Sequence, residues 1–230
     1  MNFYSEHGRS DFESLEELYE NSDVIILASS LKTLPGRMKA LAEISNKIGG
    51  EKIVFDIATF KAELIPIYSA FSRECKVASV HPMFGPGVDC IKGRRFLVVP
   101  IPGREGDSRT IGDLISSWGG EVKYVSAEEH DRLMAFAIGL PYAIGLAYLK
   151  LSLELNLGDF GGTSQAFLET YGKAVLNDSP EFIEEVIERS RDALKDFVPL
   201  IGTVDPRELL EKIGREEIEE AYRRFYRALG

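Results

Sequence analysis

The chain has 230 residues, of which 44% are hydrophobic and 28% charged, and its formal net charge is −10. This is the composition of a soluble globular protein with one large domain or two smaller ones. The acidic balance, without a basic patch, excludes nucleic acid as an expected partner. Two cysteines, Cys75 and Cys90, do not form a disulfide framework and have no metal-ligand spacing near them, so we expect reduced thiols and no metal site.

No apolar run reaches the roughly 18 residues that a membrane span needs. The N-terminal segment Met1–Asp11 is polar and has no apolar core of a signal peptide. We therefore expect no membrane association and a cytoplasmic location.

The first half alternates strand and helix patterns. Asn2–Tyr4 could end a short strand, and Ser10 with Glu13 forms a capping-box pattern for a helix to about Asn21. The strands expected after it are 24–28, 52–56, 77–80, 96–99 and 121–125, and the helices are 34–48, 61–71 and 108–118. This alternation predicts an α/β fold with a Rossmann-like parallel sheet and right-handed crossovers.

After Val125 only helical patterns follow. A second capping box, Ser126 with Glu129, begins a long apolar helix to about Leu155, and helices are expected over 164–177, 180–198 and 206–229. We therefore predict a nucleotide-binding domain over 1–125 and a helical substrate and dimerisation domain over 126–230. Because the long helix is apolar on several faces, it must be covered on all sides. We expect a homodimer through the helical domain; a purely intramolecular core is the alternative.

The most informative stretch is His81-Pro82-Met83-Phe84-Gly85-Pro86. It directly follows the buried strand pattern at 77–80, so His81 is expected at the carboxyl end of a parallel strand, where ligands bind in open α/β sheets. An imidazole can accept or donate a proton near neutral pH. On position alone, His81 could also be a hydrogen-bonded turn residue.

The hexapeptide closely resembles the signature around the catalytic histidine of prephenate dehydrogenases, enzymes of tyrosine biosynthesis. Two further segments extend the resemblance: Asp56-Ile57-Ala58-Thr59-Phe60-Lys61, and the stretch from Glu129-His130-Asp131 to Phe136. The order and spacing of the three motifs make the resemblance more specific than any one of them, and it covers roughly residues 2–198.

The resemblance implies roles for these residues. His81 would accept a hydrogen bond from the C4 hydroxyl of prephenate while hydride leaves C4 for a nicotinamide, after which the ring loses carbon dioxide. The Thr59 hydroxyl would help to position His81 and the substrate, although Thr59 could also cap the helix expected from Lys61. We interpret His130 and Asp131 as mainly structural, in the first turn of their helix and helping to cap it.

Two carboxylates of the substrate also need donors. Where relatives often have a histidine and an arginine in the helical domain, this chain has Tyr142 and Lys173. Tyr142 offers one hydrogen-bond donor, and Lys173 offers a charge without the bidentate fork of arginine. The alternatives are a core aromatic residue and a solvated helix cation.

The cofactor side departs most from the family pattern. Relatives begin with a strand, a G-x-G-x-x-G turn and a helix whose N-terminus holds the pyrophosphate. No G-x-G-x-x-G occurs in this sequence, and Asn2–Tyr4 resembles the second strand of the fold. We expect that the missing unit lies upstream of this chain or has been lost, that the strand at 24–28 exposes an apolar edge, and that the chain as given binds nicotinamide cofactor weakly or not at all.

The cofactor expected is NADP or NAD. Ser5 stands where an acidic residue usually binds the ribose of NAD, and the nearby Arg9 would suit a 2′-phosphate. Ser29 and Ser30 resemble cofactor contacts at the end of the next strand, with a strand-end turn as the alternative. We also assign Asp56 to the cofactor side.

Three functions are therefore considered. The first is oxidative decarboxylation of prephenate to 4-hydroxyphenylpyruvate, with arogenate dehydrogenation as its close variant. The second is a catalytically inert dimerisation or ligand-binding remnant of the family. A β-hydroxyacid-type dehydrogenase shares the architecture but is disfavoured, because it typically relies on a lysine in the helical domain and has no histidine–proline signature.

Overall fold

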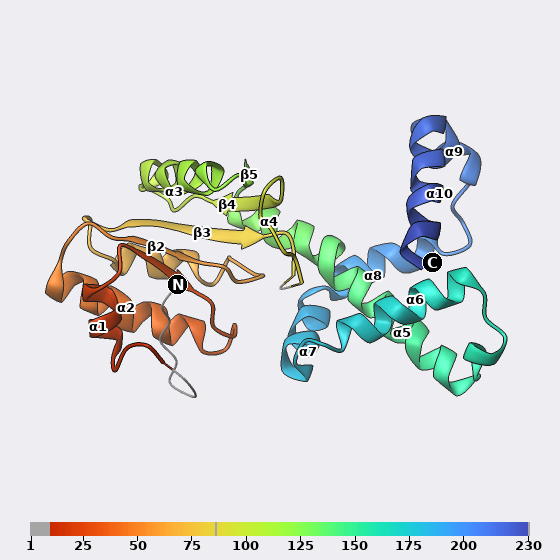
Figure 1. Cartoon of the computed structure of the whole chain (residues 1–230), viewed down its shortest axis with the longest axis horizontal. Coiled ribbons are helices and arrows are strands. Elements are labelled where there is room, and N and C mark those ends of the chain that lie inside the picture. The colour runs from red at the N-terminus through yellow and green to blue at the C-terminus, as the bar shows by residue number, and fades with distance from the viewer. Residues whose placement is uncertain (1–9, 86, 230) are drawn as a thin grey trace. The chain divides into compact units, whose positions relative to one another are not determined.

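The computed structural model describes residues 10–85 and 87–229 (Figure 1). The strand expected at Asn2–Tyr4 and the predicted cofactor contacts Ser5 and Arg9 lie outside the described residues. The chain divides into two compact units, Met1–Leu133 and Met134–Gly230. The division falls later than the boundary that the sequence suggested, because residues 130 and 131 bind groups of the first unit.

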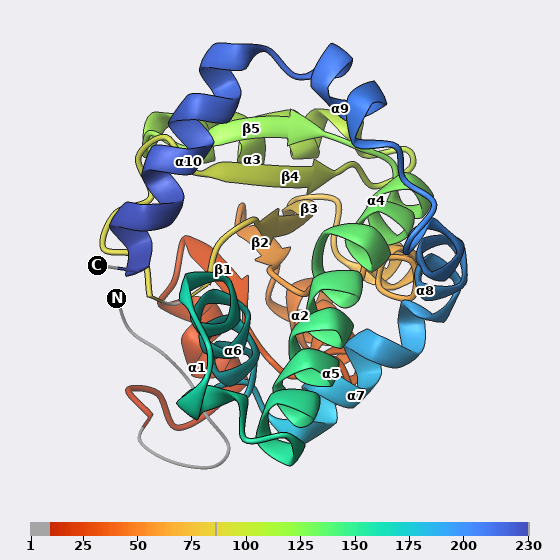
Figure 2. The same ribbon diagram turned by 90° about the vertical axis from the view of Figure 1, so that its right-hand side faces the viewer.

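The first unit is built on a five-stranded sheet (Figure 2). Its strands, which lie side by side in chain order, are β1 (Val24–Leu27), β2 (Ile53–Asp56), β3 (Lys76–Pro82), β4 (Arg95–Val99) and β5 (Glu121–Tyr124). The pairs β1/β2, β2/β3 and β4/β5 are parallel. The predicted α/β class with a Rossmann-like, mostly parallel sheet is therefore confirmed.

The pair β3/β4 is antiparallel, which the sequence pattern did not predict. A parallel pair needs a crossover of a dozen or more residues, usually a helix. The connection from Met83 to Arg94 has no helix among its described residues, so the chain turns back beside β3. His81 of β3 consequently pairs with Leu97 of β4.

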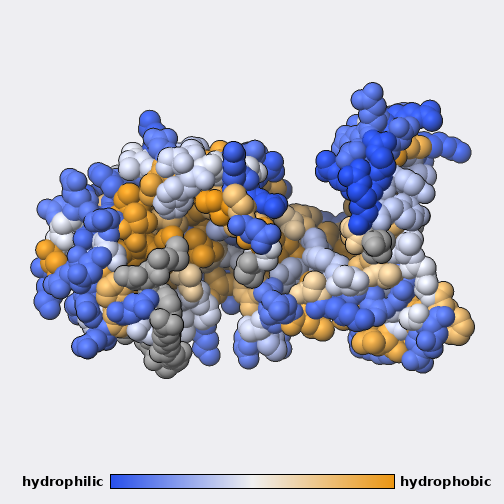
Figure 3. All heavy atoms as spheres, in the orientation of Figure 1, coloured by the Kyte–Doolittle hydropathy of each residue, from blue (hydrophilic) through white to orange (hydrophobic). Residues whose placement is uncertain are grey.

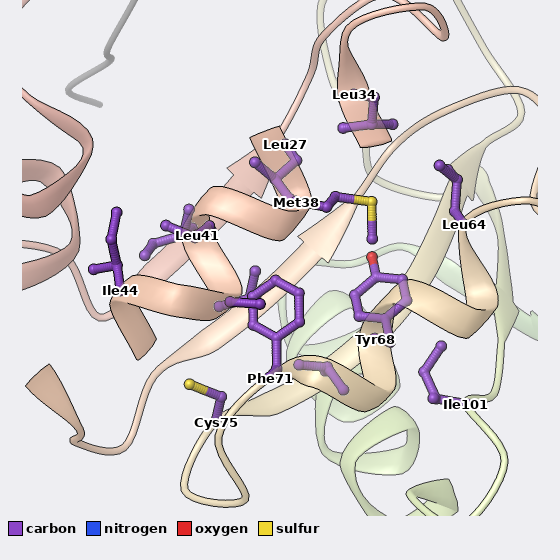
Figure 4. Packing of buried hydrophobic residues seen from close by; sticks show 14 of the residues in the cluster. Leu27, Leu34, Met38, Leu41, Ile44, Leu64, Tyr68, Phe71, Cys75 and Ile101 are labelled. Atoms are coloured by element: carbon purple, nitrogen blue, oxygen red, sulfur yellow. The ribbon is translucent and has the colours of Figure 1, made fainter. Parts of the chain in front are cut away.

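Helices cover both faces of the sheet. On one face α1 (Leu15–Glu20), α2 (Leu34–Ile48) and the 3₁₀ helix η1 (Ile65–Ala70) enclose the larger core, which Figure 4 shows from close by. There Met38 and Leu41 of α2 lie close to Tyr68 and Phe71. On the other face α3 (Glu105–Ser117) packs Ile111 and Ile115 against the strands.

The starts of α1, α3 and η1 differ from the sequence prediction, and α3 begins at Glu105 instead of Ser108. Ser14, not Ser10, caps α1, because its Oγ accepts a hydrogen bond from the backbone N–H of Glu17 at 3.1 Å. The Ser10 hydroxyl instead bonds to the backbone of Phe12 in the preceding turn. The helix expected over 61–71 is the shorter η1, which begins at Ile65.

Among the described residues, strand β1 lies at an edge of the sheet. Within the described part of the chain it pairs only with β2, and Ile26 is 37% exposed. In Figure 3 apolar side chains gather on the surface of this unit over the strands. An apolar strand edge of this kind is a template for pairing with another chain.

The second unit is helical, and no strand occurs among its described residues. Helix α4 (Ala127–Met134) lies in the first unit except for Met134. The chain continues through a π-helical turn (Ala135–Gly139) and α5 (Leu140–Glu154) of the second unit. These are followed by a 3₁₀ turn (Leu157–Asp159), α6 (Thr163–Val175), α7 (Pro180–Arg189), α8 (Arg191–Phe197), a second 3₁₀ turn (Val198–Leu200), α9 (Pro206–Lys212) and α10 (Arg215–Leu229). Helices α5 and α6 pack closely at Gly145 and Gly172, where a Cβ added at Gly172 would lie 2.5 Å from the Gly145 carbonyl oxygen.

Among the described residues, one continuous helix, Ala127–Glu154, is long and apolar enough by length and composition to cross a membrane, and 28% of its most apolar window is buried. A core helix of a soluble protein can have the same length and composition, so the expectation of no membrane association stays a prediction.

Candidate functional site

The carboxyl ends of β1, β2 and β3 meet at one edge of the sheet. The parallel register places Leu27 beside Asp56 and Asp56 beside Ser79, and His81 follows two residues further along β3. His81 is buried, with 6% of its surface exposed. The edge where open α/β sheets bind ligands thus holds a buried imidazole.

A buried carboxylate, that of Asp56, organises this edge. Its Oδ1 accepts from the Lys61 ammonium at 2.7 Å and from the Ala58 N–H at 2.9 Å. Its Oδ2 accepts from the Tyr68 hydroxyl at 2.7 Å and from the Ser79 hydroxyl. Four donors therefore satisfy a carboxylate that water does not reach. The direct cofactor contact predicted for Asp56 stays a prediction, while its observed contacts all lie within the protein.

Lys61 is the second centre of the network. Its side chain is completely buried, and its ammonium also donates to the Val80 carbonyl oxygen at 2.7 Å, directly before His81. Burial lowers the pKa of Lys61, and the Asp56 carboxylate opposes that shift. Its backbone N–H donates to Asp131 Oδ1 at 2.8 Å, and the Ala62 N–H donates to Asp131 Oδ2 at 2.8 Å.

His130 connects this network to His81. His130 Nδ1 lies 2.8 Å from Asp131 Oδ1, and His130 Nε2 lies 3.0 Å from His81 Nδ1. His130 is completely buried. The interpretation of His130 and Asp131 as caps of their own helix is wrong: Ser126 caps α4 through the Glu129 N–H, whereas Asp131 binds the backbone that follows β2.

The surroundings keep His81 uncharged at neutral pH. Burial lowers its pKa, the positive charge of Lys61 and the neighbouring His130 lower it further, and Asp131 opposes them, so the pKa of His81 is about 3. A neutral imidazole has one bare nitrogen, which can accept a hydrogen bond or a proton.

The other residues predicted at this edge are less engaged. Thr59 is half-buried, and its hydroxyl makes no hydrogen bond to any residue that the structure describes. Ser29 is half-buried, and Ser30 is exposed with its hydroxyl 2.9 Å from that of Thr33. Ser29 and Ser30 follow the end of β1, and Thr59 follows the end of β2. Their predicted roles in binding stay predictions.

In the helical unit, Tyr142 and Lys173 are bound to different acids. The Tyr142 hydroxyl donates to Asp178 Oδ2 at 2.6 Å, and burial together with this carboxylate raises the pKa of Tyr142. The Lys173 ammonium donates to Glu169 Oε1 at 2.5 Å, while its side chain remains 61% exposed. The Tyr142 hydroxyl, which the sequence motifs assign to the substrate, thus donates its proton to Asp178.

The described residues do not provide a cradle for a dinucleotide pyrophosphate. Such a cradle needs glycines at a strand-to-helix turn, so that the backbone approaches the phosphates closely. No glycine occurs between β1 and α2 or between β2 and η1. Before α3, a Cβ added at Gly103 would meet no atom within 4 Å, so no close approach of the backbone requires this glycine. The described residues therefore do not fit a dinucleotide pyrophosphate.

No cluster of three or more potential metal ligands occurs among the described histidine, cysteine and acidic residues. Cys75 is a buried free cysteine, and Cys90 is an exposed one.

The architecture places the chain among proteins that combine a Rossmann-like sheet with a helical unit, here with a histidine pair at the sheet edge. No family model matches the sequence, and no curated protein matches it. Solved structures do match the fold. One is prephenate dehydrogenase from A. aeolicus in complex with hydroxyphenyl propionate and NAD⁺, with 16% identity, a TM-score of 0.67, and coverage of 94% of this chain and 79% of that one.

Arogenate dehydrogenase from Synechocystis also matches, with 13% identity, a TM-score of 0.60, and coverage of 90% of this chain and 80% of that one. The chain therefore shares the fold of prephenate and arogenate dehydrogenases, the same group that the sequence motifs resemble.

The buried ion pair yields a stability prediction. Lys61→Met removes one partner and leaves Asp56 buried without its cation, which is expected to cost about 3–5 kcal/mol. Lys195→Ala, which removes an exposed pair with Asp192, is the matched control and should leave the free energy of unfolding almost unchanged. Urea unfolding measures both, and equal losses for the two variants would contradict the assigned role of Asp56.

A second prediction concerns the free energy of unfolding at acidic pH. The unfolded chain binds a proton at His81 near pH 6.5, whereas the folded chain does so only near pH 3. Between these values the unfolded state holds more protons, so the free energy of unfolding should fall as the pH falls. In His81→Asn this fall should be shallower, as measured by urea unfolding at a series of pH values. An unchanged slope would show that His81 is not held neutral.

Proposed function

We propose that this chain acts in an NAD(P)-dependent dehydrogenase that converts prephenate to 4-hydroxyphenylpyruvate and carbon dioxide. The observation that carries the proposal is His81, a buried neutral imidazole at the ligand-binding edge of a Rossmann-like sheet. The likeness of the fold to prephenate and arogenate dehydrogenases supports it. A cytoplasmic location is part of the same proposal.

In this reaction His81 accepts a hydrogen bond from the substrate hydroxyl through its bare ring nitrogen. As the hydroxyl carbon loses hydride, the oxygen becomes a carbonyl and its proton passes to His81. Acid–base assistance of this kind contributes typically about 10²–10⁴-fold to the rate. A bound nicotinamide, of NADP or NAD, would supply the hydride acceptor. Loss of carbon dioxide then makes the ring aromatic, and the ring oxygen takes a proton back to become the hydroxyl of the product.

The carboxylates of the substrate are assigned to Tyr142 and Lys173. Lys173 supports this role as a cation whose side chain is 61% exposed, with its ammonium on Glu169 Oε1 in the absence of substrate. Tyr142 keeps a hydroxyl oxygen whose proton is directed to Asp178. An anionic substrate carboxylate would therefore compete with Asp178 for the same proton.

Arogenate is the alternative substrate, since it differs from prephenate only in bearing an amine in place of the keto group. An inert ligand-binding remnant is the second candidate function. One observation favours it: the described residues do not supply a pyrophosphate cradle.

We further propose a homodimer through the helical unit. Apolar residues of α5, α6 and the segments after them are exposed in the single chain, among them Leu151, Leu153, Leu155, Phe160, Phe167 and Leu176. Exposed apolar surface of this extent is typical of an interaction site. A second copy is the partner that symmetry makes simplest.

Turnover tests the proposed reaction. Reduction of NAD⁺ and NADP⁺ is followed with prephenate and with arogenate, using the chain alone and extended by any in-frame upstream coding sequence. His81→Asn should lose about 10²-fold or more in kcat, while Lys150→Ala, an exposed helix residue, should match the wild type.

Full activity in His81→Asn would eliminate the catalytic assignment. Calorimetric titration with both cofactors separates the two candidate functions. Substrate binding without turnover in every form of the chain would favour the inert remnant, and micromolar cofactor binding by the chain alone would contradict the expected weak binding.

Sedimentation measures the proposed dimer. The double change Leu153→Glu and Leu155→Glu places two charges on the exposed apolar face and should shift the chain to a monomer. Lys150→Glu, on the same helix, should leave the dimer intact. A wild-type chain that is monomeric at high concentration would contradict the proposal.

A further inference from the structure

We infer that His130 and Asp131 are positioning residues that fix the tautomer of His81, so that His81 Nδ1 carries the proton and His81 Nε2 is the bare acceptor. The inference rests on the proposed role of His81 toward a substrate hydroxyl. It is carried by the order of donors and acceptors along the contacts Asp131–His130–His81.

The argument begins at Asp131, whose carboxylate can only accept hydrogen bonds when ionised. Burial opposes its ionisation, but hydrogen bonds from His130 and from the backbone of Ala62 and Lys61 outweigh burial and hold the pKa of Asp131 below its usual value. Because Asp131 Oδ1 accepts, His130 Nδ1, 2.8 Å away, must carry a proton.

When His130 carries only this proton, its Nε2 is bare. Since His81 Nδ1 lies 3.0 Å from that nitrogen, His81 Nδ1 must be the donor. The remaining nitrogen of His81, Nε2, is left without a proton, in the form that accepts one from a hydroxyl. Reversing any one bond in the series would place a proton on Nε2 and turn the acceptor into a donor.

The carboxylate is held rigidly enough for this task. Asp131 accepts from the N–H groups of Lys61 and Ala62, both at 2.8 Å, so it cannot rotate away from His130 without losing them. The completely buried His130 has no water to compete for its nitrogens. In serine proteases an aspartate likewise orients the catalytic histidine by accepting a hydrogen bond from the second ring nitrogen. Loss of that carboxylate lowers turnover about 10⁴-fold, because the histidine then adopts the wrong tautomer.

The same groups set the charge balance when His81 accepts a proton. The charged or titratable groups that face His81 are Lys61, His130 and Asp131, and only Asp131 favours the imidazolium. Removing the Asp131 charge therefore affects both the tautomer and the proton affinity of His81. Thr59, to which the sequence motifs assign the positioning of His81, makes no hydrogen bond within the described residues, whereas His130 occupies His81 Nδ1.

Three variants test the inference through turnover. His130→Leu removes the acceptor for His81 Nδ1, and Asp131→Asn removes the charge that orients His130. Each should lower kcat about 10-fold or more with little change in KM. His130→Gln can present a side-chain oxygen to His81 Nδ1 and should restore a large part of kcat. Glu129→Gln, an exposed neighbour on α4, is the matched control.

A readout that does not depend on activity is the tautomer itself. The chain has only three histidines, so long-range ¹H–¹⁵N spectra of the folded protein at neutral pH can be assigned by single substitutions. The wild type should show His81 protonated at Nδ1 and bare at Nε2, and His130→Leu should show a mixture of tautomers. A wild-type His81 protonated at Nε2, or an unchanged tautomer in His130→Leu, would overturn the inference. If the wild type shows the expected tautomer but turns over neither substrate, the proposed function is overturned and the tautomer assignment stands.

Discussion

The sheet edge depends on one constraint: a carboxylate taken out of water must be completely satisfied by the protein. Asp56 meets it with donors from its own strand end, from η1 and from β3. The cation that completes the set, Lys61, also binds the carbonyl of Val80 and, through its backbone, Asp131. Because Asp131 leads through His130 to His81, the contacts close into a ring around the strand end that carries the imidazole.

This ring of contacts explains how an α/β scaffold holds a neutral base. A histidine near bulk water would be partly charged at the pH where metabolic enzymes work. Here burial and the nearby Lys61 charge keep the pKa of His81 about 3. Holding the imidazole neutral lowers its affinity for a proton. Asp131 offsets part of this loss, because its negative charge favours the protonated ring.

The sequence predicts much of this arrangement, for identifiable reasons. Unbroken apolar runs mark β1, β2 and β3, and a Gly-Gly pair marks the end of α2, so these elements are where the patterns place them. His81 is recognisable because prolines and a glycine follow it directly. The cap at Ser14 was missed because Ser10 offers the same local pattern, and only the bond to Glu17 distinguishes the two.

What the sequence does not predict is contact between distant segments. The antiparallel pairing of β4 depends on how a connection without a described helix folds back. The His81–His130 contact joins residues 49 apart, and Asp131 binds a backbone 70 residues earlier. A histidine and an aspartate near the start of a helix are interpreted as caps of that helix, because a sequence pattern indicates only hydrogen bonds between residues close in the chain. The burial of Asp56 is likewise set by three separate segments.

The central claim is that the fold holds His81 neutral at the ligand-binding edge. An NMR pH titration of the three histidine side chains in the folded chain tests it most directly. The account predicts that the His81 resonances stay those of a neutral ring from pH 8 down through about pH 5, far below the midpoint near 6.5 of a free imidazole. A His81 that titrates with a midpoint near 6.5 would contradict the account.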